Sequence, residues 1–306
     1  MMPQPTSSLR GVLRKNEPMS AHVSWRAGGR AENWYQPADL ADMAEFLRSL
    51  PADVPVYCVG LGSNLLVRDG GLAGVVLSMH GALKTLRLET SAPSGTVYAE
   101  AGVALPKLAR FAANHDLVGA EFMAGIPGTL GGGLAMNAGC YGSDTWDVIS
   151  RVLTMNRAGE IRQRDCHEFA IGYREVIGLA ENEWFVAGWL SLMAGDGQKS
   201  RQAITTLLEK RIASQPLGQP NAGSVFRNPP DDHAARLIEI SGLKGFRIGG
   251  AQVSEKHANF IVNLGDASAA DIERIIVHVH DTVLERQGVD LTCEVRIVGV
   301  AKENMQ

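Results

Sequence analysis

The feature that most constrains this chain is an uncharged, glycine-rich segment at residues 124–142, AGIPGTLGGGLAMNAGCYG. It has seven glycines in 19 residues, within a chain of 306 residues that has 34 glycines in all. Because glycine loses more conformational freedom on folding than any other residue, this density disfavours a packed helix or strand. It predicts a loop that needs unusual dihedral angles or a close approach to a flat or anionic group. A purely structural glycine-rich loop is the alternative.

A second glycine cluster, GLGSNLLVRDGG at residues 60–71, directly follows an apolar run. Gly60 and Gly62 resemble the start of a dinucleotide fingerprint, but the third glycine of that motif would fall on a leucine, which disfavours a Rossmann site. A strand that ends in a tight turn with Ser63 and Asn64 still offers backbone N–H groups and short side chains for a pyrophosphate. An ordinary β-turn explains these residues alone equally well.

The composition is that of an ordinary globular protein, and its length leaves room for two domains of about 150 residues each. The 29 basic and 33 acidic residues give a net charge of −4, without a basic stripe for a nucleic-acid backbone. Residues 1–20 lack the apolar core of a secretory signal. The glycine-rich segment contains a proline and an asparagine as well, which disfavours a membrane span. Composition therefore disfavours nucleic-acid binding, secretion and membrane insertion.

The cysteines and histidines predict no metal site. The chain has four isolated cysteines, at Cys58, Cys140, Cys166 and Cys293. Without a C-x-x-C or paired spacing, free thiols in a reducing cytoplasm are favoured over disulfides or zinc. His278 and His280 form an H-x-H on an expected helix, where residues two apart do not face each other. We interpret both as helix-surface or packing histidines.

Apolar periodicity predicts short strands and helices in irregular alternation. The expected helices lie at residues 38–50, at 105–115, around 204–211, and between a Ser268 cap and Gly288. The expected strands lie at residues 56–59, 75–78, 97–101, 148–156, 161–164, 259–263 and 291–298. Residues 1–20 are expected to be a loose arm, and residues 194–200 are a candidate domain boundary. The irregular alternation favours an α+β fold.

The two glycine clusters together closely resemble those of the UDP-N-acetylenolpyruvoylglucosamine reductases, flavoenzymes of bacterial peptidoglycan precursor synthesis. Further matching segments follow in order: VSWRAGGRA at 23–31, GYRE at 172–175, QPNAGSVFRNP at 219–229, GGAQVSEKHANFIVN at 249–263, and LTCEVRIVG at 291–299. The resemblance covers the chain from about residue 20 to residue 299. Chance agreement over so many separated segments is negligible.

That resemblance implies an α+β fold with an FAD-binding domain of the vanillyl-alcohol-oxidase type, made of two lobes, and a smaller C-terminal substrate domain. On this chain we expect an arm at 1–20, lobes at about 21–80 and 81–195, and the substrate domain at 196–306. The FAD contacts that the resemblance implies are Gly60, Gly62, Ser63, Asn64, Gly125, Ile126, Gly131 and Asn137. The stretch between Arg174 and Ser224 is too short for the tyrosine-bearing loop of the longer members, so the chain resembles the shorter form.

The implied reaction reduces UDP-N-acetylglucosamine enolpyruvate to UDP-N-acetylmuramate, in the cytoplasm, with non-covalent FAD and with NADPH as co-substrate. Arg174 matches the catalytic arginine, whose planar guanidinium suits a substrate carboxylate, although an ion pair with Glu175 is the ordinary alternative. Ser224 matches the proton donor to the carbon beside the carboxylate, in a context that alone indicates a turn. Glu294 matches the glutamate beside the developing enolate, on a strand face that the pattern alone predicts to be solvated.

Three further residues are candidates for substrate contacts: Lys210, Asn221 and Lys256. They and His257 could instead be solvated, and the resemblance implies a monomer. Two other functions stay open on the sequence. One is another flavin oxidoreductase of the same fold, and the other is a non-catalytic UDP-sugar binding protein that has kept the fold.

Overall fold

The computed structural model describes residues 9–89 and 95–302, and the chain divides into two compact units. Unit 1 comprises the chain up to Arg14, Trp34–Leu61 and Val75–Lys210. Unit 2 comprises Lys15–Asn33, Gly62–Gly74 and the chain from Arg211 onward. Each unit is therefore assembled from segments that are far apart in the sequence. The domain boundaries expected near residues 20, 80 and 195 stay predictions.

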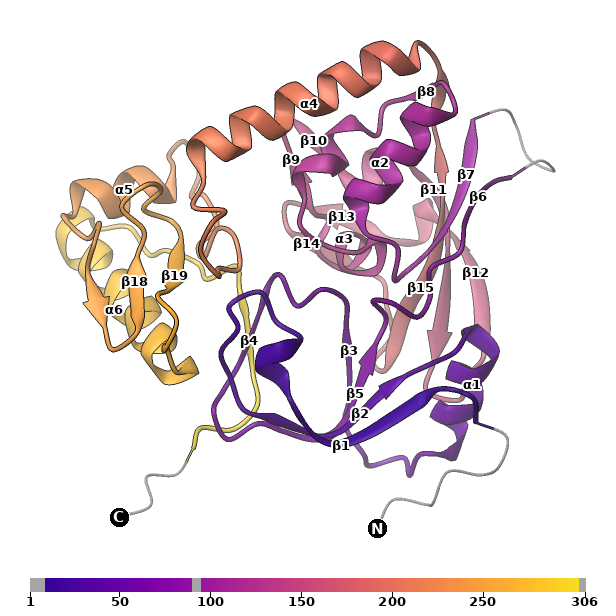
Figure 1. Ribbon diagram of the computed structural model, residues 1–306, viewed down its shortest axis with the longest axis horizontal. Helices are drawn as coiled ribbons and strands as arrows, with labels where there is room; N and C mark the ends of the chain where they lie inside the picture. Colours follow the sequence, from indigo (N-terminus) through magenta and orange to yellow (C-terminus); the bar gives the residue numbers. More distant parts are fainter. Residues whose placement is uncertain (1–8, 90–94, 303–306) are drawn as a thin grey trace. The chain divides into compact units, whose positions relative to one another are not determined.

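The main layer of unit 1 is a five-stranded antiparallel sheet with the order β12-β11-β15-β7-β6 (Figure 1). Its strands are β6 (Leu86–Leu88), β7 (Thr96–Glu100), β11 (Ile149–Asn156), β12 (Ile161–Asp165) and β15 (Glu183–Ser191). Helices α2 (Leu105–Asn114) and α3 (Leu130–Met136) lie on one side of this sheet (Figure 1). Leu108, Leu134 and Val152 belong to the buried core between the helices and the sheet.

A second, four-stranded sheet has the order β1-β2-β5-β3 and includes a parallel pair, β3 with β5. Its strands are β1 (Val12–Pro18), β2 (Arg30–Gln36), β3 (Val56–Val59) and β5 (Leu72–Ser78). Helix α1 (Leu40–Ser49) buries Met43 and Phe46 in a core with Val75 and Leu77 of β5. Tyr35 of β2 stacks on Phe46, with ring centroids 3.7 Å apart.

The start of α1 is fixed by one buried carboxylate, Asp42, which is 1% exposed. It accepts hydrogen bonds from the backbone N–H groups of Arg10 (2.7 Å) and Ala38 (2.9 Å) and from the Tyr35 hydroxyl (2.7 Å). Burial alone would raise the pKa of Asp42, but these hydrogen bonds outweigh it and keep the pKa below its ordinary value. The ionised carboxylate is therefore part of the packing of unit 1.

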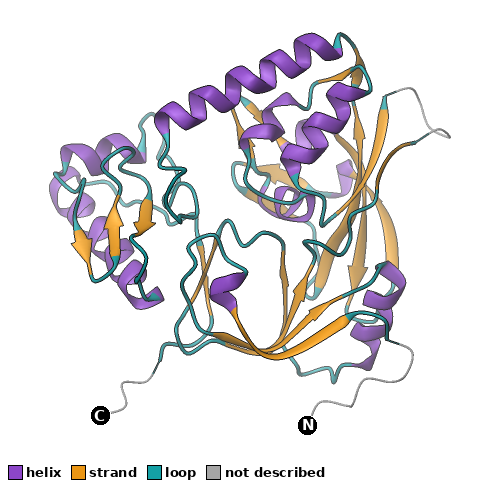
Figure 2. Cartoon of the chain, in the orientation of Figure 1, coloured by secondary structure: helices purple, strands orange, loops and turns teal. Residues whose placement is uncertain are grey.

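Unit 2 contains a three-stranded antiparallel sheet, β17 (Arg247–Ile248), β18 (Ala251–Val253) and β19 (Ile261–Asn263), beside α5 (Ala234–Ile240) and α6 (Ala269–Gln287) (Figure 2). A parallel pair, β4 (Leu65–Val67) with β20 (Arg296–Val298), belongs to the same unit. The N-terminal segment of the chain contributes Trp25, which is fully buried in this core and donates its indole N–H to Ile261 O at 2.7 Å.

The remaining elements are short pairs of strands, one long helix and four 3-10 turns. The pairs are β8 (Leu117–Val118) with β16 (Met193–Ala194), β9 (Gly139–Cys140) with β10 (Ser143–Asp144), and β13 (Ala170–Gly172) with β14 (Glu175–Ile177). The long helix is α4 (Gly197–Ser214), and the 3-10 turns are Met19–Ala21, Glu121–Gly125, Thr145–Val148 and Cys166–Glu168. Within residues 9–89 and 95–302, no helix has the length and apolar character needed to cross a membrane.

Several local predictions are confirmed, because they depend on neighbouring residues alone. Ser268 caps α6 by accepting from the Asp271 N–H, and Gly288 ends it in the left-handed conformation (φ 69°). The predicted helix and strand starting at Leu105 and Val56 begin at those residues as α2 and β3.

Three local predictions are wrong in part, and a fourth is not tested. The expected arm contains strand β1, and residues 1–8 of that arm lie outside the described residues. Helix α4 begins inside the candidate boundary at residues 194–200, which stays a prediction. Of the expected strand at 291–298, only β20 forms, because the preceding residues pair with a separate segment through an isolated bridge, Phe226 with Cys293. The glycine-rich segment contains helix α3, which was expected to be a loop.

We expect Asp42→Ala to lower the free energy of unfolding by about 2–4 kcal/mol, because three donors lose their buried acceptor. Denaturant titration at pH 7 measures this loss, and the exposed Glu181→Ala is the control, with an expected change within about 0.5 kcal/mol. Since the folded pKa of Asp42 lies below the unfolded value of about 3.9, its contribution is complete well above that pH and declines as the pH falls through it. A difference between wild type and variant that stays constant down to about pH 3.5 would contradict the assignment.

Candidate active site

The two glycine clusters meet within unit 1, where Gly60 follows β3 and Thr129 precedes α3. A Cβ at Gly60 would lie 2.4 Å from Thr129 Oγ1, so no larger residue fits without displacing that threonine. Thr129 Oγ1 is buried and has no hydrogen-bond partner within the described part of the chain. A buried hydroxyl without a partner is uncommon and marks this contact as a place where a ligand can complete the hydrogen bonding.

The three consecutive glycines of α3 have different surroundings. A Cβ at Gly131 would lie 2.9 Å from Ala101 Cβ, and one at Gly133 would lie 3.1 Å from Thr145 Oγ1. Packing therefore accounts for two of the glycines and explains how this sequence forms a helix. Gly132 is exposed, and a Cβ there would meet no atom closer than 4.0 Å. No described residue requires glycine at this position, whereas a phosphate bound at the backbone of the first helical turn would require it.

The other second-cluster residues predicted to contact FAD lie around the end of α3. A Cβ at Gly125 would lie 2.8 Å from the Tyr141 ring, and Ile126 is 9% exposed. Asn137 ends α3 in the left-handed conformation (φ 39°). Its amide donates to Gly172 O at 3.1 Å and its Oδ1 accepts from the Trp146 N–H at 3.2 Å. The structure thus shows Asn137 as a structural junction, and its contact with a cofactor stays a prediction.

The first cluster continues in unit 2 with a tight turn. Gly62 has φ 61°, and a Cβ there would lie 2.3 Å from His22 O, which explains the glycine. Ser63 is half-buried at this turn. The Asn64 amide donates to Glu294 O at 3.2 Å, so the turn is joined directly to the segment that carries a predicted catalytic residue.

Two charged residues that follow β4 connect the first cluster to helix α6. The Asp69 carboxylate accepts from the backbone N–H groups of Ala269 (3.0 Å) and Ala270 (2.9 Å), at the start of the helix. An anionic group at a helix N-terminus satisfies free N–H groups and is favoured by the helix dipole. Arg68 makes a bidentate pair with Glu273 of α6, at 2.7 and 3.0 Å. These contacts fix the cluster within unit 2.

Arg174 lies at the turn of the β13–β14 hairpin in unit 1 and has a left-handed backbone (φ 56°), which costs a non-glycine residue roughly 1 kcal/mol or more. Its guanidinium donates to the carbonyl oxygens of Asn137 (3.1 Å) and Gly139 (2.9 Å) and lies 3.7 Å from Asp144 Oδ1. Asp144 is therefore an acidic neighbour of Arg174 that the sequence analysis did not select, since the alternative considered there was Glu175. Burial raises the pKa of Asp144, and the charge of Arg174 opposes that shift.

Ser224 and Glu294 are brought together within unit 2, although 69 residues lie between them in the sequence. The Glu294 N–H donates to Val225 O at 2.8 Å, and the Arg227 N–H donates to Thr292 O at 2.9 Å. Both predicted catalytic residues are half-buried. Around Glu294, Leu291 and Val295 are buried while Thr292 and Arg296 are exposed, so the predicted alternation of faces is confirmed.

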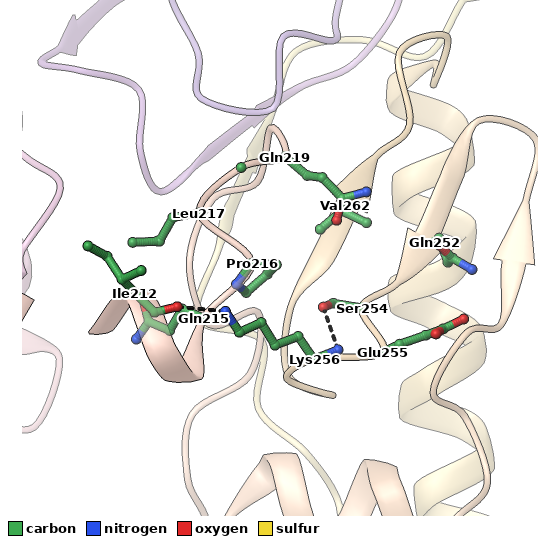
Figure 3. A pocket seen from close by; sticks show the side chains of 11 residues that line it. Ile212, Gln215, Pro216, Leu217, Gln219, Gln252, Ser254, Glu255, Lys256 and Val262 are labelled. Atoms are coloured by element: carbon green, nitrogen blue, oxygen red, sulfur yellow. Dashed lines mark hydrogen bonds between the residues drawn. The ribbon is translucent and has the colours of Figure 1, made fainter. Parts of the chain in front are cut away.

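Unit 2 also contains a hollow of about 540 Å³ formed by the chain that follows α4 and by the loop after β18. Lys256 points into it and donates to Ile212 O at 2.6 Å, and Glu255 is on the same loop (Figure 3). Gln215, Gln219 and Gln252 add neutral polar groups to the wall. Such a lining, with one ammonium, one carboxylate and several amides, suits a polar ligand that can form hydrogen bonds as well as meet the ammonium.

The other candidate substrate residues do not lie together at one place. Asn221 stabilises the turn before Ser224, since its amide donates to Gln219 O and its Oδ1 accepts from the Gly223 N–H. Lys210 is exposed on α4 in unit 1. His257 Nδ1 is buried without a hydrogen-bond partner among the described residues, and burial lowers the pKa of this imidazole.

The two histidines of α6 are explained by packing and ion pairing. His278 stacks on Phe246 with ring centroids 4.1 Å apart, and His280 lies 2.8 Å from carboxylate oxygens of both Asp281 and Asp290. These carboxylates raise the pKa of His280. Across residues 9–89 and 95–302, no group of three or more acidic, histidine or cysteine side chains could bind a metal ion.

Sequence reasoning missed Thr129, Asp144 and Asn259. Thr129 and Asp144 lie close in the sequence to residues that were selected, but their partners Gly60 and Arg174 are distant. Asn259 lies within one of the quoted motifs, yet only the fold shows what its side chain contacts.

Residues 32–164 match the family model of an FAD binding domain, and residues 215–298 match the model described as UDP-N-acetylenolpyruvoylglucosamine reductase, C-terminal domain. Together with the α+β architecture, these matches place the chain among FAD-binding flavoproteins of the vanillyl-alcohol-oxidase type that carry a separate C-terminal domain.

Similar proteins cover almost the whole chain. It is 60% identical over 302 residues to UDP-N-acetylenolpyruvoylglucosamine reductase of Thiobacillus denitrificans, covering 95% of this chain and 93% of that protein. It is 50% identical over 307 residues to the reductase of Coxiella burnetii, covering 95% and 97%. The crystal structure of the Thermus caldophilus reductase superposes with a TM-score of 0.80 at 28% identity, covering 95% of this chain and 100% of that one. The chain belongs to the UDP-N-acetylenolpyruvoylglucosamine reductase family.

The residues present fit FAD. The unpartnered Thr129 hydroxyl, the exposed glycine at position 132 and the tight turn at Gly62 are features that a pyrophosphate would require. Which of the predicted residues contact the cofactor stays a prediction.

We expect Gly132→Ala to stabilise the FAD-free protein by up to about 1 kcal/mol, because alanine favours helix and its Cβ meets open space. If FAD approaches this backbone, the same substitution weakens FAD binding. Thermal unfolding of the FAD-free protein and fluorescence titration with FAD separate the two effects. Gly131→Ala is the matched control: it meets Ala101 and should lower stability. Unchanged FAD affinity in Gly132→Ala would remove this residue from the cofactor site.

Proposed function

We infer that this chain reduces UDP-N-acetylglucosamine enolpyruvate to UDP-N-acetylmuramate, with FAD bound non-covalently and NADPH as co-substrate, in peptidoglycan precursor synthesis. Relatives named for this reductase activity are 50 and 60% identical over nearly the full length of the chain. The observation that carries the mechanism is the adjacency of Ser224 and Glu294 within unit 2. We further propose that the protein acts as a cytoplasmic monomer.

Bound FAD supplies the hydride, which originates from NADPH and is added to the terminal methylene carbon of the enolpyruvyl group. The chain's own residues must then stabilise negative charge on the substrate carboxylate and deliver a proton to the neighbouring carbon.

Arg174 is the proposed partner of the substrate carboxylate. Two backbone carbonyl groups already hold its guanidinium, so the planar group has a fixed orientation before a carboxylate ligand binds. Preorganised charged donors in a partly buried site stabilise a developing enolate more effectively than mobile ones. The left-handed backbone at Arg174 is strain that the hairpin maintains at a functional position.

Ser224 is the proposed proton donor, and Glu294 the group that works beside it. A hydroxyl is a weak acid, but a carbon with enolate character is a strong base, so the transfer is feasible when a neighbour supports the serine oxygen. The hydrogen bond from Glu294 N–H to Val225 O keeps the two residues in register. Their presence together favours an enzyme over a non-catalytic UDP-sugar binding protein.

The hollow beside Lys256 is the proposed place for the diphosphate or sugar part of the substrate. The Lys256 ammonium is held at 2.6 Å from a backbone carbonyl and keeps two further N–H donors for an anion. Glu255 lies on the same wall and lowers the local positive charge. We therefore propose that Lys256 contributes more to the orientation of the bound substrate than to its binding affinity. Asn221 and Lys210 remain proposed substrate contacts.

The direct test is anaerobic NADPH oxidation by the purified protein with and without the enolpyruvyl substrate, with mass spectrometry of a product heavier by two hydrogens. We expect Arg174→Lys to lower turnover about a hundredfold or more, because a point charge replaces a bidentate fork. Arg162→Lys, an exposed arginine on β12, is the control and should keep wild-type turnover. Absence of the reduced product in the wild type would overturn the proposed function.

Ser224→Ala should separate the two half-reactions. Reduction of the flavin by NADPH needs no proton from this side chain and should keep its rate, whereas reoxidation by the substrate should slow by at least about 10²–10⁴-fold. Stopped-flow absorbance measures both steps. Ser224→Cys should recover part of the rate, and Thr292→Ala, an exposed neighbour, should change neither step. Equal slowing of both steps in Ser224→Ala would mean that Ser224 shapes the flavin site and is not the acid.

A further inference from the structure

The two residues that follow Ser224 are held by a single buried residue, Asn259, through its side chain and its backbone. Asn259 Oδ1 accepts from the Phe226 N–H at 2.9 Å, and Asn259 Nδ2 donates to Phe226 O at 2.8 Å. The backbone oxygen of Asn259 also accepts from the Val225 N–H at 2.9 Å. Asn259 is 3% exposed, and Val225 and Phe226 are each 1% exposed.

The opposite edge of the same segment faces the residues around Glu294. Val225 O accepts from the Glu294 N–H at 2.8 Å, and Phe226 forms an isolated bridge with Cys293. Val225 and Phe226 therefore lie between Asn259 on one edge and the Glu294 segment on the other. On the preceding side, the Gly223 N–H donates to Asn221 Oδ1 at 3.0 Å, and Gly223 itself has φ 77° and open space around its Cβ position. The buried contacts of the Ser224 segment therefore lie mainly after Ser224, at Val225 and Phe226.

The chemistry of the contact explains why the residue is asparagine. Phe226 presents one buried donor and one buried acceptor, and only a side chain with an acceptor and a donor in one plane satisfies both. A leucine of similar size would leave both groups unpaired, and an ionised aspartate would leave the carbonyl facing a negative charge.

We propose that Asn259 is a positioning residue for proton donation: it fixes the backbone after Ser224 and so keeps the serine hydroxyl in the position from which it donates. This inference rests on the proposed role of Ser224 as the acid. Asn259 acts through the backbone of Val225 and Phe226. Its loss should displace the hydroxyl, and a displacement of about 1 Å is enough to cost on the order of a hundredfold in rate.

The chain offers a matched control in Asn263, four residues further on. Asn263 is also 3% exposed, and its side chain makes three hydrogen bonds, to Trp25 O, the Gly265 N–H and the Ala267 N–H, where that of Asn259 makes two. None of these bonds involves Val225 or Phe226. Substitution at either asparagine removes a buried amide, but only substitution at Asn259 releases the Ser224 segment.

The test compares Asn259→Asp with Asn263→Asp in the FAD-loaded enzyme by stopped-flow measurement of both half-reactions. We expect Asn259→Asp to slow reoxidation by the substrate roughly 10–100-fold at pH 8, with flavin reduction by NADPH unchanged. Asn263→Asp should lower the melting temperature without this selective slowing. Hydrogen exchange of the Val225 and Glu294 amides should become faster only in Asn259→Asp, a readout independent of activity.

Lower pH should rescue Asn259→Asp. A protonated aspartate again has one donor and one acceptor, and burial raises its pKa, so the reoxidation rate relative to wild type should rise as the pH falls from 8 toward 5. Titratable or charged groups near this segment include Glu294, Cys293, Arg227 and His257, and comparison with wild type at each pH removes their contribution. A rate ratio that does not change with pH would contradict the proposal.

The double variant Ser224→Ala, Asn259→Asp distinguishes this inference from the proposed function. If Asn259 acts through Ser224, the double variant should be no slower than Ser224→Ala alone. Additive slowing, or normal reoxidation in a folded Asn259→Asp, would overturn the positioning role while leaving Ser224 as the acid. Normal reoxidation in Ser224→Ala would instead overturn the proposed function itself.

Discussion

The parallel pairing of β4 with β20 is the interaction on which unit 2 depends, because it joins the first glycine cluster to the segment that carries Glu294. Arg296 N–H donates to Asn64 O, and the Asn64 side chain donates to Glu294 O, so the pairing extends to the turn itself. Arg68 and Asp69 then connect the end of β4 to α6. The position of Glu294 is therefore set jointly by residues near 65 and residues near 296, and the C-terminal chain alone does not contain the whole unit.

Glycine serves two physical purposes in the clusters. At Gly60 and Gly131 it permits an approach that a Cβ would block, against Thr129 and Ala101. At Gly132 no atom of the described residues would block a Cβ, which is the pattern expected where a ligand is the neighbour. Helix α3 forms although it contains three glycines, which have a low helix propensity. Packing against adjacent elements compensates for that low propensity.

Backbone groups fix the positions of the proposed catalytic residues. Carbonyl oxygens hold the guanidinium of Arg174, and a backbone hydrogen bond from Glu294 holds the segment after Ser224. Main-chain contacts of this kind are rigid because secondary structure fixes both partners, and rigid support is what a charged or weakly acidic group needs in order to act at one position.

The sequence by itself determined the features that depend on neighbouring residues: the α+β class, the Ser268 cap and Gly288 end of α6, the alternation around Glu294, and motifs specific enough to indicate the family. Only the tertiary structure decided that Arg174 lies beside Asp144, that Gly131 packs on Ala101, and that Asn259 binds Phe226. Periodicity and caps arise from contacts within a few residues, so they can be read along the chain. The partner of a buried donor, charge or glycine is set by which distant segments the fold brings within hydrogen-bond or van der Waals distance, and no local pattern contains that information.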